Sequence, residues 1–385
     1  MNRYFVSVIM LVFVVVSLLA QTTPESDFTV TLTADNAGVV IVRYNGSASV
    51  VRIPPTIQGI PVREISGRGT GHNMVGAFQN NNTITSVVIP EGVISISDGG
   101  SHGSFSGGVF LNCTRLATVT LPSTLTRVGN YAFSGCSSLQ TIIIPTGVTA
   151  IGHGAFERCT ALRNVTLSSG LISIGDRAFQ KCTALQNISL PNTITSIGQN
   201  AFMECSSLQS INLPDSLTRI DRGAFWDSGL TSIKWPASVT VINGRMFNGC
   251  KNLRTVDIPV GVTVLEGDQG SSGLTSSSPV AGPFAGCSSL TSIILPEGLT
   301  TIGATSFAGT SITSINLPST IRRIGHYAFG NNPSLTTVTI PESVQQIVFE
   351  SDNTTYSIVR TFAGSPNINL MSQAVLRRVG FRGEF

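Results

Sequence analysis

Seven cysteines are the residues of this chain best suited to chemistry, and their spacing indicates what they do. Consecutive cysteines lie 23 residues apart over one long stretch: Cys113, Cys136, Cys159, Cys182 and Cys205. Cys250 and Cys287 fall at the same place in the pattern, where other copies carry Ser, Thr or Asn. A position that accepts all four residue types needs a small side chain that hydrogen-bonds a turn backbone. We therefore expect buried free thiols.

Disulfides between stacked layers are the alternative for these cysteines. Strands about 5 Å apart lie within the reach of such a bridge. The odd number of cysteines would then leave at least one of them unpaired.

No other group of residues predicts a catalytic or metal site. The four histidines are scattered between His72 and His326, and no C-x-x-C pair exists, which argues against structural zinc. Gly103–Gly107 resembles a nucleophile elbow only in its glycines, because Phe105 stands where that motif needs Ser. His153 and His326 share one repeat position with Asp and Gln in other copies, which is typical of a solvated turn. We expect no enzyme, no metal and no cofactor.

Composition favours strands and turns and argues against two classes of partner. Only 11% of the 385 residues are charged, against about 25% in an average protein. The net charge is +3, and no run of Lys or Arg is present. This is not the electrostatic pattern of a protein that binds nucleic acid or anionic lipid. Nothing in the composition predicts the oligomeric state.

Residues 1–20 have the pattern of a secretory signal. Arg3 precedes a run from Phe5 to Ala20 that only Ser7 and Ser17 interrupt. Sixteen residues span about 24 Å as a helix, less than the roughly 30 Å of a hydrocarbon core. We expect removal of this segment near Ala20 and no membrane span afterwards. The mature protein should be exported, to the cell surface, the medium or the periplasm.

A repeat of 23 residues dominates the rest of the chain. Its pattern is L-x-x-I-x-L-P-x-x-L-T-x-I-G-x-x-A-F-x-x-C, as in Leu139–Cys159. One phenylalanine marks each of twelve copies: Phe78, Phe110, Phe133, Phe156, Phe179, Phe202, Phe225, Phe247, Phe284, Phe307, Phe329 and Phe362. Because one copy is too small to bury its own apolar face, the copies must stack on a continuous core. We predict a mostly β, curved solenoid of about twelve repeats, very roughly 55 to 60 Å long.

These residues resemble a known family. The repeat is similar to the leucine-rich repeat of the Treponema pallidum type, found in BspA-like bacterial surface proteins, and the resemblance covers nearly all of residues 50–365. Val51–Val62 resembles the first repeat of that family, and Leu376–Phe385 resembles a terminal signature of its spirochaete members. The resemblance implies a solenoid at the surface or in the periplasm that binds proteins. Extracellular-matrix proteins, fibronectin among those to test, and host-cell receptors are the partners it implies.

The two ends of the stack need caps, since an open sheet edge is prone to mispairing. Phe28–Leu32 and Val39–Tyr44 flank a turn-rich stretch and predict a hairpin over the first layer. Leu370, Val375, Leu376 and Val379 are compatible with a short amphipathic helix at the other end. We divide the chain into a signal at 1–20, a β cap at 21–53, the leucine-rich-repeat solenoid at 54–365 and a terminal cap or tail at 366–385.

The first strand of each repeat predicts the most regular binding surface. Its outward positions are mostly small and weakly polar, so they can also be read as β-favouring filler exposed to solvent. Asn212, Lys234, Asp257 and Asn316 stand out on it. Two aromatic residues, Trp226 and Trp235, lie in the same copies as the two charges, although Trp235 occupies an inward Leu position and is equally consistent with the core.

Four copies carry insertions between the second strand and the phenylalanine, after Ile65, Ile96, Leu265 and Ile347. All four occur at one place in the repeat and should emerge on one side of the solenoid. They are either binding loops or tolerated decoration. Three further candidate binding residues lie in them: His72, His102 and Asp268.

The sequence therefore predicts a non-enzymatic, protein-binding protein of the cell surface or envelope, either an adhesin or an interaction scaffold. A periplasmic structural scaffold without a host ligand is the alternative.

Overall fold

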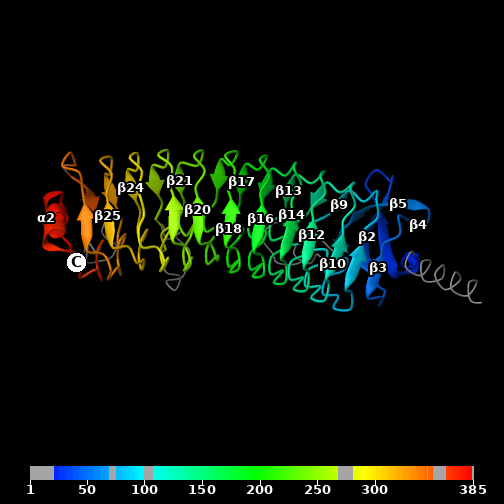
Figure 1. Cartoon of the computed structure of the whole chain (residues 1–385). Coiled ribbons are helices and arrows are strands. Elements are labelled where there is room, and N and C mark those ends of the chain that lie inside the picture. The colour runs from blue at the N-terminus through cyan, green and yellow to red at the C-terminus, as the bar shows by residue number, and fades with distance from the viewer. Residues whose placement is uncertain are drawn as a thin grey trace, which may run out of the picture.

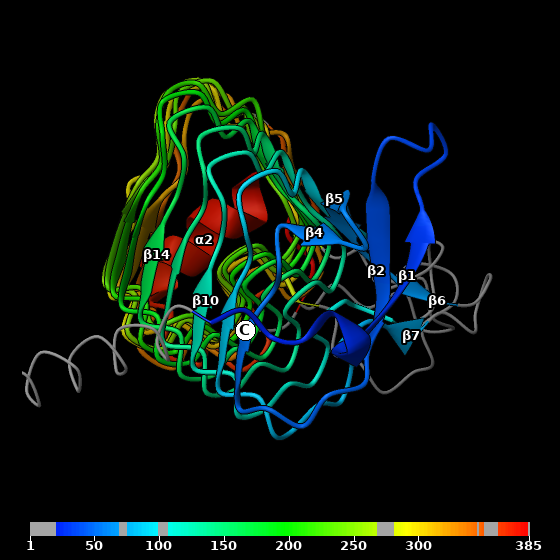
Figure 2. The same ribbon diagram turned by 90° about the vertical axis from the view of Figure 1, so that its right-hand side faces the viewer.

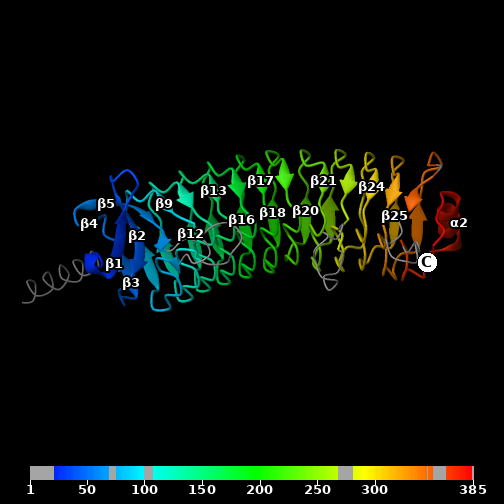
Figure 3. The same ribbon diagram turned by 180° about the vertical axis from the view of Figure 1, so that it is seen from behind.

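The computed structural model describes residues 21–68, 75–98, 107–267, 281–344, 346–349 and 361–383. The chain winds into an elongated solenoid with the N-terminal strands at one end and helix α2 (Leu370–Arg378) at the other (Figures 1 and 3). Most repeats contribute one strand to each of two sides, while residues 290–296 follow the same path without forming a strand. Figure 2 looks along the rod and shows β10 and β14 on one side of the cross-section and β5 on the other. The predicted solenoid is confirmed.

One side, which we call the front face, consists of three-residue strands from the L-x-x-I-x-L segment. Inward Val or Ile side chains alternate with outward polar ones, and a proline soon after most strands prevents a longer ladder. These strands are β3 (Val50–Arg52), β8 (Ser86–Val88), β10 (Thr118–Thr120), β12 (Thr141–Ile143), β14 (Asn164–Thr166), β16 (Asn187–Ser189), β18 (Ser210–Asn212), β20 (Ser232–Lys234), β22 (Thr255–Asp257), β25 (Ser314–Asn316) and β27 (Thr337–Thr339). They form short parallel sheets, β10-β8-β3, β12-β14, β16-β18, β20-β22 and β25-β27.

The opposite side, the back face, consists mainly of two-residue strands from the L-T-x-I segment. They pair in parallel in the order β5-β9-β11-β13-β15-β17-β19 and, separately, β21-β23-β24-β26-β28. Their bounds are β5 (Ile60–Ile65), β9 (Ser95–Ile96), β11 (Arg127–Val128), β13 (Ala150–Ile151), β15 (Ser173–Ile174), β17 (Ser196–Ile197), β19 (Arg219–Ile220), β21 (Val241–Ile242), β23 (Val264–Leu265), β24 (Thr301–Ile302), β26 (Arg323–Ile324) and β28 (Val348–Phe349).

A column of phenylalanine rings fills the core between the two faces. All twelve repeat phenylalanines are buried. Each ring stacks on the next, with centroids 4.8 to 5.8 Å apart. The column is therefore continuous through every layer, which is the shared core that the repeat predicts.

At the N-terminal end, the predicted hairpin is present. Strands β1 (Phe28–Leu32) and β2 (Val39–Tyr44) pair antiparallel, and β2 pairs with β5 of the back face. The Tyr44 ring stacks on Phe78 at 5.1 Å and thereby extends the aromatic column. Short elements complete this end: the 3-10 helix η1 (Glu25–Asp27), β4 (Thr56–Ile57), β6 (Gly67–Arg68) and β7 (Val75–Gly76).

At the C-terminal end, α2 is the predicted short helix. Asn369 caps its N-terminus by accepting a hydrogen bond from the Ser372 backbone at 2.9 Å. The Ser372 hydroxyl in turn accepts one from the Val338 backbone at 3.0 Å, so the helix covers the edge of β27. Phe381 closes the aromatic column edge-on against Phe362 at 5.3 Å. Within the described residues, no helix has the length and hydropathy to cross a membrane.

Candidate binding face

The outward positions of the front face are its first and third strand residues. The first is Ser, Thr or Asn in every repeat strand from β8 onward. The third varies from layer to layer: Val88, Thr120, Ile143, Thr166, Ser189, Asn212, Lys234, Asp257, Asn316 and Thr339, with Ile294 at the equivalent place between β22 and β25. Two aliphatic side chains in this row are unusually exposed, Ile143 at 69% and Ile294 at 85%. A hollow surrounds each of them.

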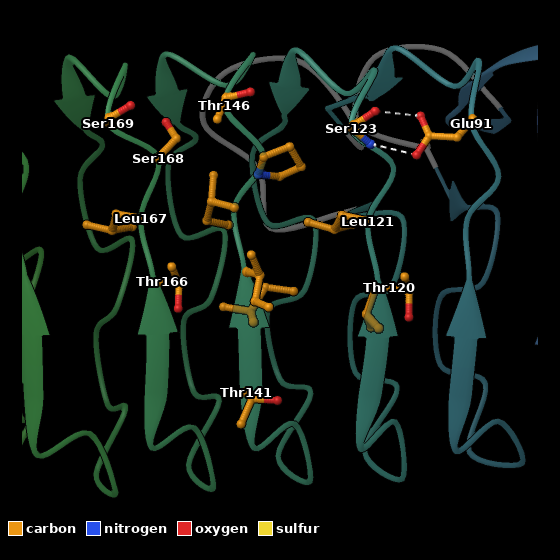
Figure 4. A pocket seen from close by; sticks show the side chains of 15 residues that line it. Glu91, Thr120, Leu121, Ser123, Thr141, Thr146, Thr166, Leu167, Ser168 and Ser169 are labelled. Carbon is orange, nitrogen blue, oxygen red and sulfur yellow. Dashed lines mark hydrogen bonds between the residues drawn. The ribbon is translucent and has the colours of Figure 1, made fainter.

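The first hollow has a volume of about 610 Å³ and is lined mainly by the layers of β10, β12 and β14 (Figure 4). Ile143 belongs to the middle one of these layers. Thr120 and Thr166 lie on either side of it, and Leu121 and Leu167 contribute apolar walls. Both leucines are only partly buried. An aliphatic floor with a rim of hydroxyl groups suits an apolar side chain whose flanking backbone or polar groups need hydrogen-bond partners.

Local departures from the repeat pattern create this hollow. The inward strand residue is Val at Val119 and Val165, in place of the larger Ile142 between them, and both valines are only partly buried. Ser168 replaces the usual proline and donates its hydroxyl proton to the Val148 carbonyl at 2.9 Å. These smaller side chains leave the space open.

Glu91 fixes the rim of the first hollow nearest the N-terminus. Its carboxylate accepts hydrogen bonds from the Ser123 backbone at 3.0 Å and from the Ser123 hydroxyl at 2.9 Å. These bonds lower the pKa of the Glu91 carboxyl, the one from the backbone most. Glu297 holds Ser319 in the same way, which shows that the contact is a general device for joining neighbouring turns.

The second hollow has a volume of about 500 Å³ and lies on the same face. The third strand positions of its three layers are Lys234, Asp257 and Ile294. Lys234 and Asp257 are register partners in the parallel pair β20-β22, and both side chains are exposed. This hollow therefore combines one cation, one anion and one exposed aliphatic side chain in adjacent layers.

The two tryptophans do not belong to this surface. Trp235 is 1% exposed, donates its Nε1 proton to the Val239 carbonyl at 2.9 Å, and packs edge-on against Phe247. It is a core residue beneath Lys234, so its assignment to the binding surface is wrong. Trp226 is half-buried beside the Phe column, and the Arg245 guanidinium lies 5.2 Å from its ring centroid. It is not among the residues that line the second hollow.

The remaining predicted surface residues fall into two groups. Asn212 and Asn316 are exposed at third strand positions of the front face, as expected. His72, His102 and Asp268 lie outside the described residues, as do most of the four insertions. Their role in binding stays a prediction.

The seven cysteines are buried free thiols, as their spacing predicts, and are not joined in disulfides. Each thiol donates to the carbonyl of a repeat phenylalanine, 3.0 to 3.2 Å away, as Cys182 does to Phe156. Burial raises the pKa of the Cys113, Cys205 and Cys250 thiols to about 12. Such thiols are inert as nucleophiles at neutral pH.

The histidine positions contribute to turns. The His153 backbone donates to the Asn130 side chain at 2.7 Å, and the Asp98 carboxylate accepts in the same way from the Asn130 backbone at 2.6 Å. In these layers a side-chain oxygen holds the next turn, and Asp176 does the same for the Gln199 backbone at 2.8 Å. Among the described residues, no cluster of three or more His, Cys, Asp or Glu side chains is placed to hold a metal ion.

The sequence predicts which strand positions point outward, but it does not single out Ile143 or Ile294 among them. The feature of the sequence that could have identified them is an aliphatic residue at an outward position where most layers carry a polar one. The hollow around each depends on packing several layers together, and single positions do not encode it.

Comparison with known proteins identifies the family of repeats to which the chain is similar. A family model described as the BspA type leucine-rich repeat region matches residues 74–188, 172–269 and 281–371. A leucine-rich repeat protein of Bacteroides ovatus is 25% identical, with 91% of this chain and 93% of that one aligned at a TM-score of 0.59. The T. pallidum leucine-rich repeat protein is 27% identical over 70% of this chain and 91% of its own, at a TM-score of 0.40.

The pneumococcal vaccine antigen PcpA is 18% identical over 94% of this chain and 98% of its own, at a TM-score of 0.54. None of the functionally curated proteins matches. Since the family model covers well over half of the residues, the chain belongs to the BspA-type leucine-rich repeat family.

Proposed function

We propose that this protein is an exported, non-enzymatic binding protein whose front face docks other proteins, as an adhesin or an interaction scaffold. The observation that carries the proposal is the pair of hollows around Ile143 and Ile294. Exposed apolar surface with a polar rim marks sites of protein interaction. Membership of a leucine-rich-repeat family supports a protein partner over a small substrate.

The distribution of charge supports the same conclusion. From β8 onward the third strand positions carry one lysine and one aspartate, and the other nine side chains are uncharged. Arg52, the third residue of β3, adds one further cation at the N-terminal end of the face. A nearly neutral face gives no long-range attraction for a polyanion. Binding must therefore come from shape and apolar contact over several layers.

The test is binding of the chain from residue 21 onward to immobilised matrix proteins, fibronectin included, at increasing salt concentration. We expect saturable binding that persists at high salt, because apolar anchors are not screened. Labelling intact cells with a membrane-impermeant reagent then separates an adhesin, which is labelled, from a periplasmic scaffold, which is not. Absence of binding to every matrix protein, together with absence of labelling, would contradict the adhesin role and favour the scaffold.

A further inference from the structure

The second hollow presents three side chains of different chemistry in a fixed order along the solenoid. Lys234, Asp257 and Ile294 occupy equivalent positions in three successive layers. Lys234 and Asp257 lie on the paired strands β20 and β22, which are about 4.8 Å apart. Ile294 follows in the next layer, on a segment that forms no strand, and at the same layer spacing it stands about 9.6 Å from Lys234. The succession of layers therefore fixes the order of the three side chains, first the cation, then the anion and then the aliphatic group.

The two charges are available to a partner. Within the described part of the chain, neither Lys234 nor Asp257 takes part in an ion pair shorter than 4.0 Å. Both side chains are exposed, and Ile294 beside them is 85% exposed. A segment that covers the hollow must therefore meet a cation, an anion and an apolar group.

The backbone beneath the two charged side chains is firmly held. Lys234 lies between two buried residues, Ile233 and Trp235. The Trp235 backbone donates to the Asp257 carbonyl at 2.9 Å, which ties the two charged layers together. A rigid platform lowers the entropy lost on binding.

The spacing selects the conformation of the occupant. In an α-helix, residues i, i+3 and i+7 share one face and are separated by about 4.5 and 10.5 Å along the axis, close to the spacing of the layers. In an extended strand, residues on one side are about 6.7 Å apart and lose register within two layers. A helix laid along the solenoid fits this row of side chains, whereas an extended strand does not.

We propose that the second hollow docks an amphipathic helix of a partner protein, which lies along the long axis of the solenoid. The helix places an acidic side chain against Lys234, a basic one against Asp257 and an aliphatic one on Ile294. This inference rests on the proposed function and specifies the partner surface that the front face recognises.

The probe is a hydrocarbon-stapled helical peptide with Glu, Arg and Leu at i, i+3 and i+7 and Gln or Ala elsewhere. A second peptide exchanges Glu and Arg. Binding of each to the chain from residue 21 onward is followed by fluorescence anisotropy. We expect the matched peptide to bind at least about threefold more tightly than the exchanged one, and the preference to decrease at high salt.

A charge-swapped variant supplies the decisive comparison. Lys234→Asp combined with Asp257→Lys should invert the preference between the two peptides. Ile294→Ser should weaken both. The matched control is Arg219→Asp with Asp221→Arg, which exchanges a charge pair at β19 on the back face and should leave the preference unchanged.

Two results would overturn the inference: no saturable binding of either stapled peptide, or a preference that the Lys234 and Asp257 exchange leaves unaltered. Its failure is distinguishable from failure of the proposed function. If Ile143→Ser weakens binding to a matrix protein while the peptides do not bind, the front face still docks proteins, but not through a helix at the second hollow.

Discussion

The aromatic column and the third strand positions of the front face differ in one respect that separates architecture from recognition. The column repeats one residue type in every layer, and each ring is buried between two others. The front-face positions change from Ile143 to Thr166 to Lys234 without any change in the strands that carry them. The constant phenylalanines hold the layers together, whereas the variable third strand positions can differ according to the partner that they contact. The predictions below test this division.

The largest effect should come from a break in the column. Phe179→Ala removes a ring stacked at 5.4 Å on Phe156 and 5.5 Å on Phe202, and should lower the free energy of unfolding by about 3–5 kcal/mol. Urea denaturation followed by circular dichroism measures this. The comparison variant is Ile143→Ser on the front face, for which we expect a change within about 0.5 kcal/mol. Similar losses in the two variants would contradict the division.

The cysteine ladder should come next. Cys182→Ala removes one of two donors to the Phe156 carbonyl, which keeps the Cys159 backbone N–H at 3.2 Å. It should lower the free energy of unfolding by about 0.5–1.5 kcal/mol. Cys182→Ser retains a donor at a position where other layers already use Ser228 and Thr310, so it should cost less. Equal losses would show that the thiol contributes volume and no hydrogen bond.

The same thiols predict a decrease in stability at alkaline pH. Burial raises the pKa of Cys205 and Cys250 from an ordinary 9.0 to about 12, so the folded state keeps protons that the unfolded state releases. Their contribution is complete below pH 9 and is lost as the pH rises toward 12. Denaturation under reducing conditions at pH 7.5 and pH 10 measures the loss. Cys205→Ser, whose hydroxyl does not ionise, should show a shallower dependence, and an identical one would argue against this cause.

A smaller effect is expected at the C-terminal cap. Asn369→Ala removes the side chain that caps α2 and should cost about 1 kcal/mol. Because α2 covers the edge of β27, hydrogen exchange should accelerate at Val338 while the central layers keep their protection. Uniform acceleration through the whole stack would mean that the layers unfold together.

The smallest effect concerns His153. Partial burial lowers its pKa, against the opposing pull of the Asp176 carboxylate 3.9 Å away. The folded state therefore favours the neutral ring, and stability should fall as the pH drops below about 6.5, by at most about 0.5 kcal/mol after solvent screening. His153→Gln, which copies Gln199 in the equivalent position, should remove this dependence. If the stability of His153→Gln still falls with decreasing pH, the dependence arises from other titratable groups.

Much of the fold can be predicted from the sequence because the same pattern of apolar and turn residues recurs in every repeat. The 23-residue period predicts the stack, and the turn between Phe28–Leu32 and Val39–Tyr44 predicts the hairpin. The inward Leu position left the core open as an alternative for Trp235, which the structure places there. Each of these features depends on local pattern or on one repeat position.

Other features depend on contacts between layers and could not be predicted in this way. Lys181 and Glu204 adopt left-handed backbone conformations, with φ of 61° and 58°, although neither type favours them. Backbone bonds to the next layer, 2.8 and 2.7 Å long, impose this conformation. The two hollows likewise depend on side chains from three layers that pack together. The sequence therefore predicted the front face as the candidate site, but it did not predict the two hollows on that face.

The central claim is that partners dock on the front face through Ile143 and Ile294. Its most direct test compares two double variants in binding to a matrix protein that the unaltered chain binds. One is Ile143→Ser with Ile294→Ser. The other is Ile94→Ser with Ile172→Ser, which changes isoleucines that are 46% and 48% exposed beside the back-face strands β9 and β15. We predict at least about tenfold weaker binding for the first pair and unchanged binding for the second. Equal effects of the two pairs, or loss only with the back-face pair, would contradict the account.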